Sequence, residues 1–286
     1  MKKVILCPNL MRDEASQLTY RVSEIIEKNG GRAVICPFFA DEKDIPAHDR
    51  LVFSDISDEL RDAYMIITLG GDGTILKAAR AAASFNVPIL GVNLGYMGFM
   101  TELDYDEIEY IDKAFSGEYT IKKRMMLDVE LIRNDKVVFT DFALNDVVVR
   151  GLSRVIDISL FGDGELISRF SGDGTVVATP TGSTAYSMSA GGPIVEPSAE
   201  NIIITPICAH ALATKSFVLA PDRDVYIELG GKKTNPAYLS VDGGDTIELY
   251  TGDKVHIRRS AKQTDLVSIA NRSFYKIVSE KLGERT

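Results

Sequence analysis

Short apolar runs alternate with amphipathic stretches through the first third of the chain, and this alternation restricts the fold more than any other feature. The runs that predict strands are residues 4–7, 32–35, 64–69 and 88–92. The stretches between them that predict helices are residues 14–28, 75–83 and 106–115. Because nearly continuous apolar strands must be covered on both faces, we expect an α/β domain with a parallel sheet.

After about Gly117 the pattern changes to alternating strands that are separated by turn sequences, and this predicts a β-rich second domain. The last part of the chain again resembles a strand followed by a helix, so we expect it to return to the first domain. The predicted boundaries are residues 1–118, completed by 266–286, for the α/β domain and 119–265 for the β-rich domain.

The charge balance bears on the partners of the chain. Its 286 residues include 32 Lys and Arg against 41 Asp and Glu, a formal charge of −9. Such a balance repels nucleic acid and anionic membrane surfaces. We therefore expect small-molecule partners, with no nucleic acid and no membrane.

The cysteines and the N-terminus bear on location. Cys7, Cys36 and Cys208 lie far apart without a CxxC pair, which argues against a disulfide framework. The apolar start of the chain is cut short by Pro8 and polar residues, so we interpret it as a first strand rather than a signal peptide. A cytoplasmic location fits these features best.

The sharpest local motif joins a predicted strand to a predicted helix: Gly70, Gly71, Asp72, Gly73 and Thr74. In an open α/β sheet, ligands bind where strands end. Glycines let backbone N–H groups approach phosphate oxygens, and the following helix N-terminus favours anions. A single carboxylate among them suits a proton acceptor or a magnesium ligand. The alternative is plain turn chemistry, which we predict for residues 162–164, a hairpin turn.

Two better-known phosphate motifs do not occur in the sequence. It contains neither GxxxxGK[ST] nor GxGxxG. The chain is therefore neither an ordinary P-loop kinase nor a dehydrogenase with the usual dinucleotide fingerprint.

Longer segments resemble one family. Residues 70–74 look like the GGDGT motif that NAD kinases share, more loosely, with lipid kinases and phosphofructokinases. Residues 172–193 (GDGTVVATPTGSTAYSMSAGGP) are similar to the longer signature of the NAD kinase family. Further matches follow in family order at residues 91–101, 145–146, 205–210 and 241–243.

This resemblance implies an enzyme that transfers the terminal phosphoryl group of ATP, with polyphosphate as the alternative donor, to the 2′-hydroxyl of the adenosine ribose of NAD. It implies Asp72 as the catalytic base, with Gly70, Gly71, Gly73 and Thr74 at the ATP phosphates. Magnesium, or another divalent metal, would arrive with ATP, because no cluster of carboxylates predicts an all-protein cage. A homodimer or homotetramer is what the family implies.

The residues that the resemblance places at NAD are Asp72, Gly73, Phe99, Asn145, Asp146, Asp173, Thr184, Ala185, Tyr186 and Ser189. Tyr186 and Phe99 are expected to offer aromatic faces to a base, and burial in the core is the alternative for each. Thr184 suits a ligand hydrogen bond or an ordinary helix N-cap. Asn145 and Asp146 interrupt an apolar run, so either they contact a ligand or they mark a bulge or edge.

Two positions depart from the family pattern. The family usually has Glu where this chain has Asp146, a shorter side chain. It commonly has Arg two residues before Asp173, where this chain has Ser171. Arg169 is expected on the same strand face as Ser171, and a second hairpin turn is the alternative for Asp173.

The histidines do not predict a metal site. His48, His210 and His256 lack zinc-ligand spacing, so no protein metal ligands are expected. Two other functions stay open. A lipid kinase with the same glycine motif would need a membrane-docking stretch, which the sequence lacks. An NAD-binding sensor that has lost catalysis would not need an acid at position 72.

Overall fold

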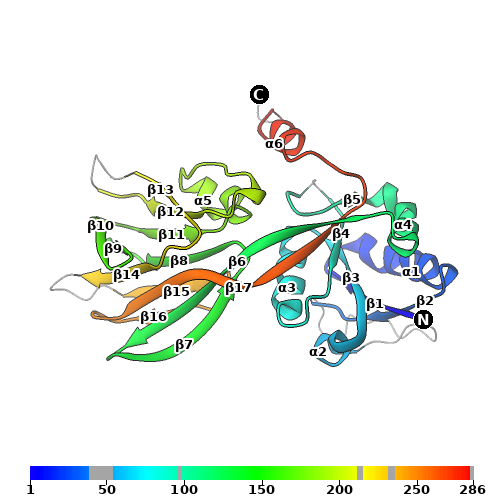
Figure 1. The fold of residues 1–286 in the computed structure, drawn as a ribbon, viewed down its shortest axis with the longest axis horizontal. Helices are drawn as coiled ribbons and strands as arrows, with labels where there is room; N and C mark the ends of the chain where they lie inside the picture. The colour runs from blue at the N-terminus through cyan, green and yellow to red at the C-terminus, as the bar shows by residue number, and fades with distance from the viewer. Residues whose placement is uncertain (39–53, 96–97, 211–214, 231–235, 284–286) are drawn as a thin grey trace. The chain divides into compact units, whose positions relative to one another are not determined.

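The computed structural model describes residues 1–38, 54–95, 98–210, 215–230 and 236–283, and the chain forms two compact units. The first unit contains residues 1–123 and 264–286, and the second contains residues 124–263. Figure 1 shows both, coloured along the chain. His48 lies outside the described residues.

The first unit is built on a parallel sheet. Its strands are β1 (Lys2–Pro8), β2 (Gly31–Ile35), β3 (Ala63–Gly70), β4 (Ile89–Asn93) and β5 (Leu103–Asp104). Their order is β2-β1-β3-β4-β5, and every neighbouring pair is parallel. The end of the long strand β17 (Lys254–Ser268) also pairs in parallel with β4, through Leu266 and Ile89. The predicted return of the C-terminal segment to the first domain is therefore confirmed.

Helices lie between these strands or follow them in the chain. They are α1 (Asp13–Lys28), α2 (Ile56–Glu59), α3 (Asp72–Ala82), α4 (Asp112–Ser116) and α6 (Phe274–Gly283), with 3₁₀ turns η1 (Leu60–Asp62) and η2 (Tyr105–Ile111). Apolar residues of α1, η2 and α4 pack with those of β1, β3 and β4 in one core cluster. The helix expected at residues 106–115 is instead divided between η2 and α4. In the described part of the chain, every helix is too short or too polar to span a bilayer.

The second unit is β-rich, as predicted. The strands that lie in it or enter it are β6 (Thr120–Arg133), β7 (Lys136–Ala143), β8 (Asp146–Gly151), β9 (Ile156–Gly162), β10 (Glu165–Gly172), β11 (Gly174–Ala178), β12 (Ile202–Ile207), β13 (Phe217–Leu219), β14 (Val225–Gly230), β15 (Ala237–Val241), β16 (Ile247–Leu249) and β17. One sheet has the order β13-β12-β11-β8-β15-β16. The other contains β10-β9-β14-β17, with β6 pairing both β17 and β7.

Apolar side chains from both sheets of the second unit form one core, because alternate residues of each strand point to the same face. Val147, Val149 and Val177 belong to that core. Val148, Val176 and Ala178 point to the opposite face of their sheet, where Ala190 and Val195 cover them. Those two covering residues belong to the segment that also contains η3 (Gly182–Thr184), α5 (Tyr186–Ser189) and η4 (Pro197–Ala199).

The turn predicted at residues 162–164 is confirmed. It joins β9 to β10 in an antiparallel hairpin, with φ values of 52° at Asp163 and 84° at Gly164. Positive φ at both central residues matches the right-handed twist of the paired strands. Asp163 is thus part of a hairpin turn, whereas Asp72 lies where a strand is followed by a helix.

Candidate functional site

The glycine motif of the first unit forms a close turn between β3 and α3. A side-chain carbon at Gly70 would lie 2.2 Å from Oγ1 of Thr74, so this approach requires glycine. By contrast, a side-chain carbon at Gly71 or Gly73 would meet no protein atom within 4 Å. Protein packing therefore does not explain these two glycines, and open space beside the N-terminus of α3 can receive an anion.

Asp72 is the first residue of α3, and its carboxylate is held by the backbone after β4. Oδ2 accepts from the N–H of Phe99 at 2.8 Å, and Oδ1 accepts from the N–H of Met100 at 3.0 Å. A side-chain carbon at Gly98 would lie 2.1 Å from Oδ1. Each carboxylate oxygen keeps a second lone-pair direction, so the half-buried group can still accept a proton.

Phe99 is half-buried, and the ammonium of Lys281 from α6 lies 4.5 Å from its ring centroid. A cation over an aromatic face is an attractive contact. The structure thus places the Phe99 ring beside the C-terminal helix, with part of it exposed, and not in a fully buried core.

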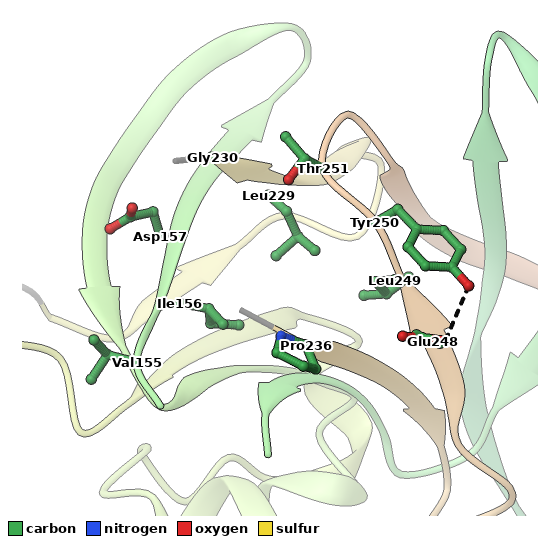
Figure 2. A pocket seen from close by; sticks show the side chains of 10 residues that line it. All are labelled: Val155, Ile156, Asp157, Leu229, Gly230, Pro236, Glu248, Leu249, Tyr250 and Thr251. Carbon is green, nitrogen blue, oxygen red and sulfur yellow. Dashed lines mark hydrogen bonds between the residues drawn. The ribbon is translucent and has the colours of Figure 1, made fainter. Parts of the chain in front are cut away.

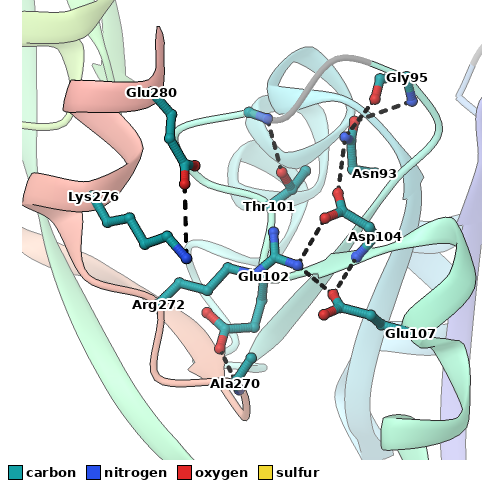
Figure 3. Close-up of polar contacts among 11 residues, drawn as sticks. Asn93, Gly95, Thr101, Glu102, Asp104, Glu107, Ala270, Arg272, Lys276 and Glu280 are labelled. Carbon is teal, nitrogen blue, oxygen red and sulfur yellow. Dashed lines mark hydrogen bonds and ion pairs between the residues drawn. The ribbon is translucent and has the colours of Figure 1, made fainter. Parts of the chain in front are cut away.

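A polar network holds the chain on either side of Phe99 (Figure 3). Nδ2 of Asn93, the last residue of β4, donates to the carbonyl oxygen of Gly95 at 2.8 Å and to Oδ1 of Asp104 at 3.2 Å. The N–H of Gly98 donates to Oγ1 of Thr101 at 3.1 Å. The first two bonds hold the end of β4, and the third holds Gly98, which precedes the two N–H groups that donate to Asp72.

Arg272 and Glu102 join this network to the C-terminal segment. Arg272 forms ion pairs with Asp104, at 2.7 Å, and with Glu107. Oε1 of buried Glu102 accepts from the hydroxyl of Ser268 and from the N–H groups of the next two residues, at 2.7–3.0 Å. Among the described residues, Nη1 of Arg272 is buried without a hydrogen-bond partner. Local sequence patterns contain no signal for these long-range contacts.

In the second unit, Asn145 and Asp146 lie where the chain crosses from one sheet to the other. β7 ends at Ala143 and β8 begins at Asp146, so these residues do not interrupt a single strand as the apolar run suggested. The bulge interpretation is also wrong, because β7 and β8 do not pair. Both side chains are buried, and Oδ1 of Asn145 has no hydrogen-bond partner within the described chain.

Burial and the nearby charge of Asp242 together raise the pKa of Asp146 to about 7. Asp242 follows β15, and its carboxylate accepts hydrogen bonds from the N–H groups of residues 144–146. No role for Asp242 follows from the sequence alone. Its only signal was the family-like match at residues 241–243, which also resembles an ordinary turn.

The chain that follows β11, residues 179–199, is called the signature segment below. Its residues Ala190 and Val195 cover the outer face of the sheet that contains β8 and β11. Ser183 Oγ donates to the carbonyl oxygen of Pro180 at 2.7 Å, and Ser187 Oγ lies 2.9 Å from Oγ1 of Thr205. These internal bonds hold the segment in place. Thr184 is not an N-cap, because it ends η3 and its hydroxyl donates to the carbonyl oxygen of Thr181.

The predicted ligand residues of this segment remain accessible. Thr184 and Ala185 are half-buried, and Tyr186 and Ser189 are exposed. Tyr186 is 38% exposed, which excludes the interpretation of a core tyrosine. Its ring can therefore stack on a planar group.

Asp173 joins β10 to β11, which belong to different sheets, so it does not form a second hairpin turn. Its side chain is exposed, and its N–H donates to the carbonyl oxygen of Ile207. Arg169 does share a strand face with Ser171, but its Nε donates to Oγ of Ser159 at 3.0 Å. Ser171 donates to Asp157.

His256 and a cavity in the second unit lie outside the predicted site. His256 in β17 stacks on Tyr226 and contacts Glu130 and Asp224. A cavity of about 190 Å³ lies between the ends of β9 and β14 and the strand β16 (Figure 2). None of its lining residues is predicted to bind ATP or NAD. Among the described residues, no three His, Cys, Asp or Glu side chains gather closely enough to hold a metal ion.

Solved structures with a similar architecture define the fold class. The fold resembles yeast NADH kinase in complex with NADH, with a TM-score of 0.88 over 99% of this chain and 88% of that chain at 24% identity. It also resembles an NAD kinase from Archaeoglobus fulgidus in complex with ATP, with a TM-score of 0.74 over 98% of both chains, again at 24% identity. This is the two-domain fold of the NAD kinases.

Sequence comparison then assigns the family. The model of the ATP-NAD kinase N-terminal domain matches residues 4–119, and that of the C-terminal domain matches residues 144–269. An NAD kinase of Natranaerobius thermophilus is 40% identical over 99% of this chain and 98% of that protein. An NAD kinase of Geobacter sulfurreducens is 43% identical over 78% of this chain and 80% of that protein. The chain belongs to the ATP-NAD kinase family, and neither the lipid kinase nor the sensor alternative is favoured.

Proposed function

We propose that this protein transfers the terminal phosphoryl group of ATP to the 2′-hydroxyl of the adenosine ribose of NAD, giving NADP. The observation that carries this proposal is the position of Asp72. It is a single carboxylate at the start of α3, beside glycines that leave open space, and two backbone N–H groups orient it. Phosphoryl transfer needs such a group to accept the hydroxyl proton while the phosphates are held in line.

Gly70, Gly71, Gly73 and Thr74 would hold the ATP phosphates at the N-terminus of α3. Half-buried Gly71 and exposed Gly73 would offer backbone N–H groups, and the helix would offer the positive end of its dipole, to phosphate oxygens. A divalent metal such as Mg²⁺ would arrive with ATP, since Mg²⁺ is usually bound through substrate phosphates together with one or two carboxylates. When bound it would neutralise charge that develops on the phosphates. Polyphosphate would satisfy the same contacts.

Residues of the second unit would recognise NAD. Buried Oδ1 of Asn145 is an acceptor without a protein partner, and an amino group such as that of adenine would satisfy it. Asp146 would contact a ribose hydroxyl, and Tyr186 would stack on a base. Thr184, Ala185 and Ser189 surround Tyr186 in the sequence, and exposed Asp173 would bind the nicotinamide end. The family resemblance assigns Asp72, Gly73 and Phe99 to NAD as well.

The wider setting is also a proposal. Cys7, Cys36 and Cys208 are free thiols, which fits a reducing cytoplasm. A homodimer or homotetramer follows from the family resemblance. Size-exclusion chromatography with light scattering measures the assembly directly.

The test is incubation of the purified protein with NAD, MgATP and a reporter dehydrogenase that accepts only NADP. We expect NADP formation that requires the divalent metal and ATP or polyphosphate. A parallel reaction replaces NAD with a lipid substrate. Phosphorylation of lipid without phosphorylation of NAD would overturn the proposal.

A further inference from the structure

One carboxylate organises the backbone of the proposed NAD-binding residues. Oδ2 of Asp242 accepts from the N–H of Leu144 at 2.7 Å. Oδ1 accepts from the N–H of Asn145 at 2.7 Å and from the N–H of Asp146 at 2.9 Å. The N–H of Asp242 donates in return to the carbonyl oxygen of Asp146 at 2.9 Å. Four bonds therefore tie the crossover between β7 and β8 to the end of β15.

The same crossover is fixed from the side of the signature segment. Oγ1 of Thr179 donates to the carbonyl oxygen of Leu144 at 2.6 Å. The backbone N–H of Thr179 donates to the carbonyl oxygen of Asn145 at 2.9 Å. A side-chain carbon at Gly182 would lie 2.0 Å from the Asn145 carbonyl oxygen. Because the backbone is held on both sides, the Asn145 and Asp146 side chains have little freedom to choose their direction.

Asp242 is also the charge that acts on Asp146. Asp146 is 5% exposed, and burial followed by the charge of Asp242 raises its pKa to about 7. Of the described elements that flank it, β11 and residues 179–185 contain no titratable side chain. Tyr238 of β15 lies opposite Arg150, at the far end of β8.

We propose that Asp242 is a positioning residue of the NAD-binding half-site, one that sets both the backbone path of residues 144–146 and the charge that Asp146 carries. This inference rests on the proposed role of Asn145 and Asp146 in NAD binding. The ionised form of Asp146 accepts a hydrogen bond from a ribose hydroxyl, whereas the protonated form competes by donating.

NAD binding then depends on pH through Asp146. Because Asp146 ionises near pH 7 in the free enzyme, we expect the KM for NAD to fall about tenfold as the pH rises from about 6 to about 8. Asp242→Asn removes the second charge, so Asp146 ionises at lower pH, although burial still keeps its pKa above the usual carboxyl range. The midpoint of the pH profile of KM for NAD therefore also moves to lower pH, by on the order of one pH unit.

The experiment combines two readouts. The first is the titration of the Asp146 carboxyl carbon by ¹³C NMR, with the signal assigned by its loss in Asp146→Asn. The second is the pH profile of KM for NAD. Asp245→Asn is the matched control, because exposed Asp245 lies in the same turn and loses the same charge, whereas the N–H groups of residues 144–146 donate to Asp242. We expect Asp242→Asn to lower the midpoint of the Asp146 titration and to move the pH profile of KM for NAD to lower pH. Asp245→Asn should change neither.

An unchanged midpoint in folded Asp242→Asn would overturn the proposal, since a merely structural role changes activity without changing this titration. If Asp242→Asn does not fold, Asp242→Glu keeps the charge and displaces the carboxylate by one methylene. That variant should retain the raised midpoint and show a raised KM, and a midpoint in the usual carboxyl range would contradict us. Absence of NAD phosphorylation by the wild type would refute the proposed function, whereas the NMR titration would still test Asp242.

Discussion

The N–H of Phe99 donates a 2.8 Å hydrogen bond to Oδ2 of Asp72, across 27 positions of the sequence. The residue proposed to line the nucleotide pocket thus also orients the proposed base. The orientation comes from backbone and not from a side chain, so it survives many substitutions at position 99 and depends on the path of residues 98–100.

Asp72→Asn should abolish turnover and preserve NAD binding. The amide keeps the shape of the carboxylate but cannot take the hydroxyl proton, so we expect kcat to fall by on the order of 10²–10⁴. Steady-state kinetics and calorimetric titration with NAD measure the two effects. Asp163→Asn, at the hairpin turn, is the control. Turnover equal to that of the wild type would refute Asp72 as the base.

Gly98→Ala should act on the same carboxylate without changing its chemistry. The new methyl carbon would lie 2.1 Å from Oδ1 of Asp72 and 2.9 Å from Oγ1 of Thr101, so Asp72 must move. We expect kcat to fall by at least about tenfold, because a misplaced catalytic group loses its alignment. Gly95→Ala is the matched control, since its methyl carbon would meet nothing within 4 Å. Similar kinetics of the two variants would contradict this prediction.

Glu102→Ala should destabilise the protein. Its Oε1 accepts three hydrogen bonds from residues 268–270, and the side chain is buried. Figure 3 shows the bond from Ala270. Removing the acceptor leaves buried donors unpaired, so the free energy of unfolding should fall by about 2–4 kcal/mol. Urea unfolding measures this against Glu109→Ala, an exposed acid of η2. Equal losses in both variants would mean that the C-terminal segment does not depend on Glu102.

Asp146→Asn should change how stability depends on pH. The folded-state pKa of Asp146, about 7, lies above that of the unfolded chain, so the folded protein holds a proton that the unfolded chain releases. The stability from this proton is complete below the unfolded pKa and is lost as the pH rises through about 7. Relative to Asp146→Asn, the wild type should lose about 2–3 kcal/mol between about pH 5 and about pH 8. A constant difference over that range would show that Asp146 titrates normally.

Local patterns were sufficient for the architecture. The alternation of apolar runs and helix-like stretches predicted a parallel α/β domain, a β-rich second domain and a returning C-terminal segment, and all three are present. Context also separated two similar motifs correctly, since Gly162-Asp163-Gly164 lies between strands and Gly70-Gly71-Asp72 lies between a strand and a helix. Strand and helix periodicity is a property of neighbouring residues, so a single sequence contains it.

Residue types and their order, together with the family resemblance, also singled out the candidate site residues. Asp72, Asn145 and the segment around Tyr186 were all identified in this way, and their roles at ATP and NAD stay predictions. The sequence was less successful where a segment changes sheets. Asn145 and Asp146 look like an interruption of one strand, and Asp173 resembles a hairpin turn, because the apolar pattern is the same whether the next strand pairs with the last or crosses to another sheet.

The contacts that aim these side chains were decided only by the tertiary structure. Asp242 reaches the N–H of Asn145 across 97 positions, and Arg272 reaches Asp104 across 168. Such hydrogen bonds depend on strand order, register and the direction of each crossover. The sequence pattern near either residue does not indicate any of these. The sequence alone therefore determined which groups are available for chemistry, and the fold decided how each is held and which of them carries a proton, because burial and neighbouring charge exist only after the chain has folded.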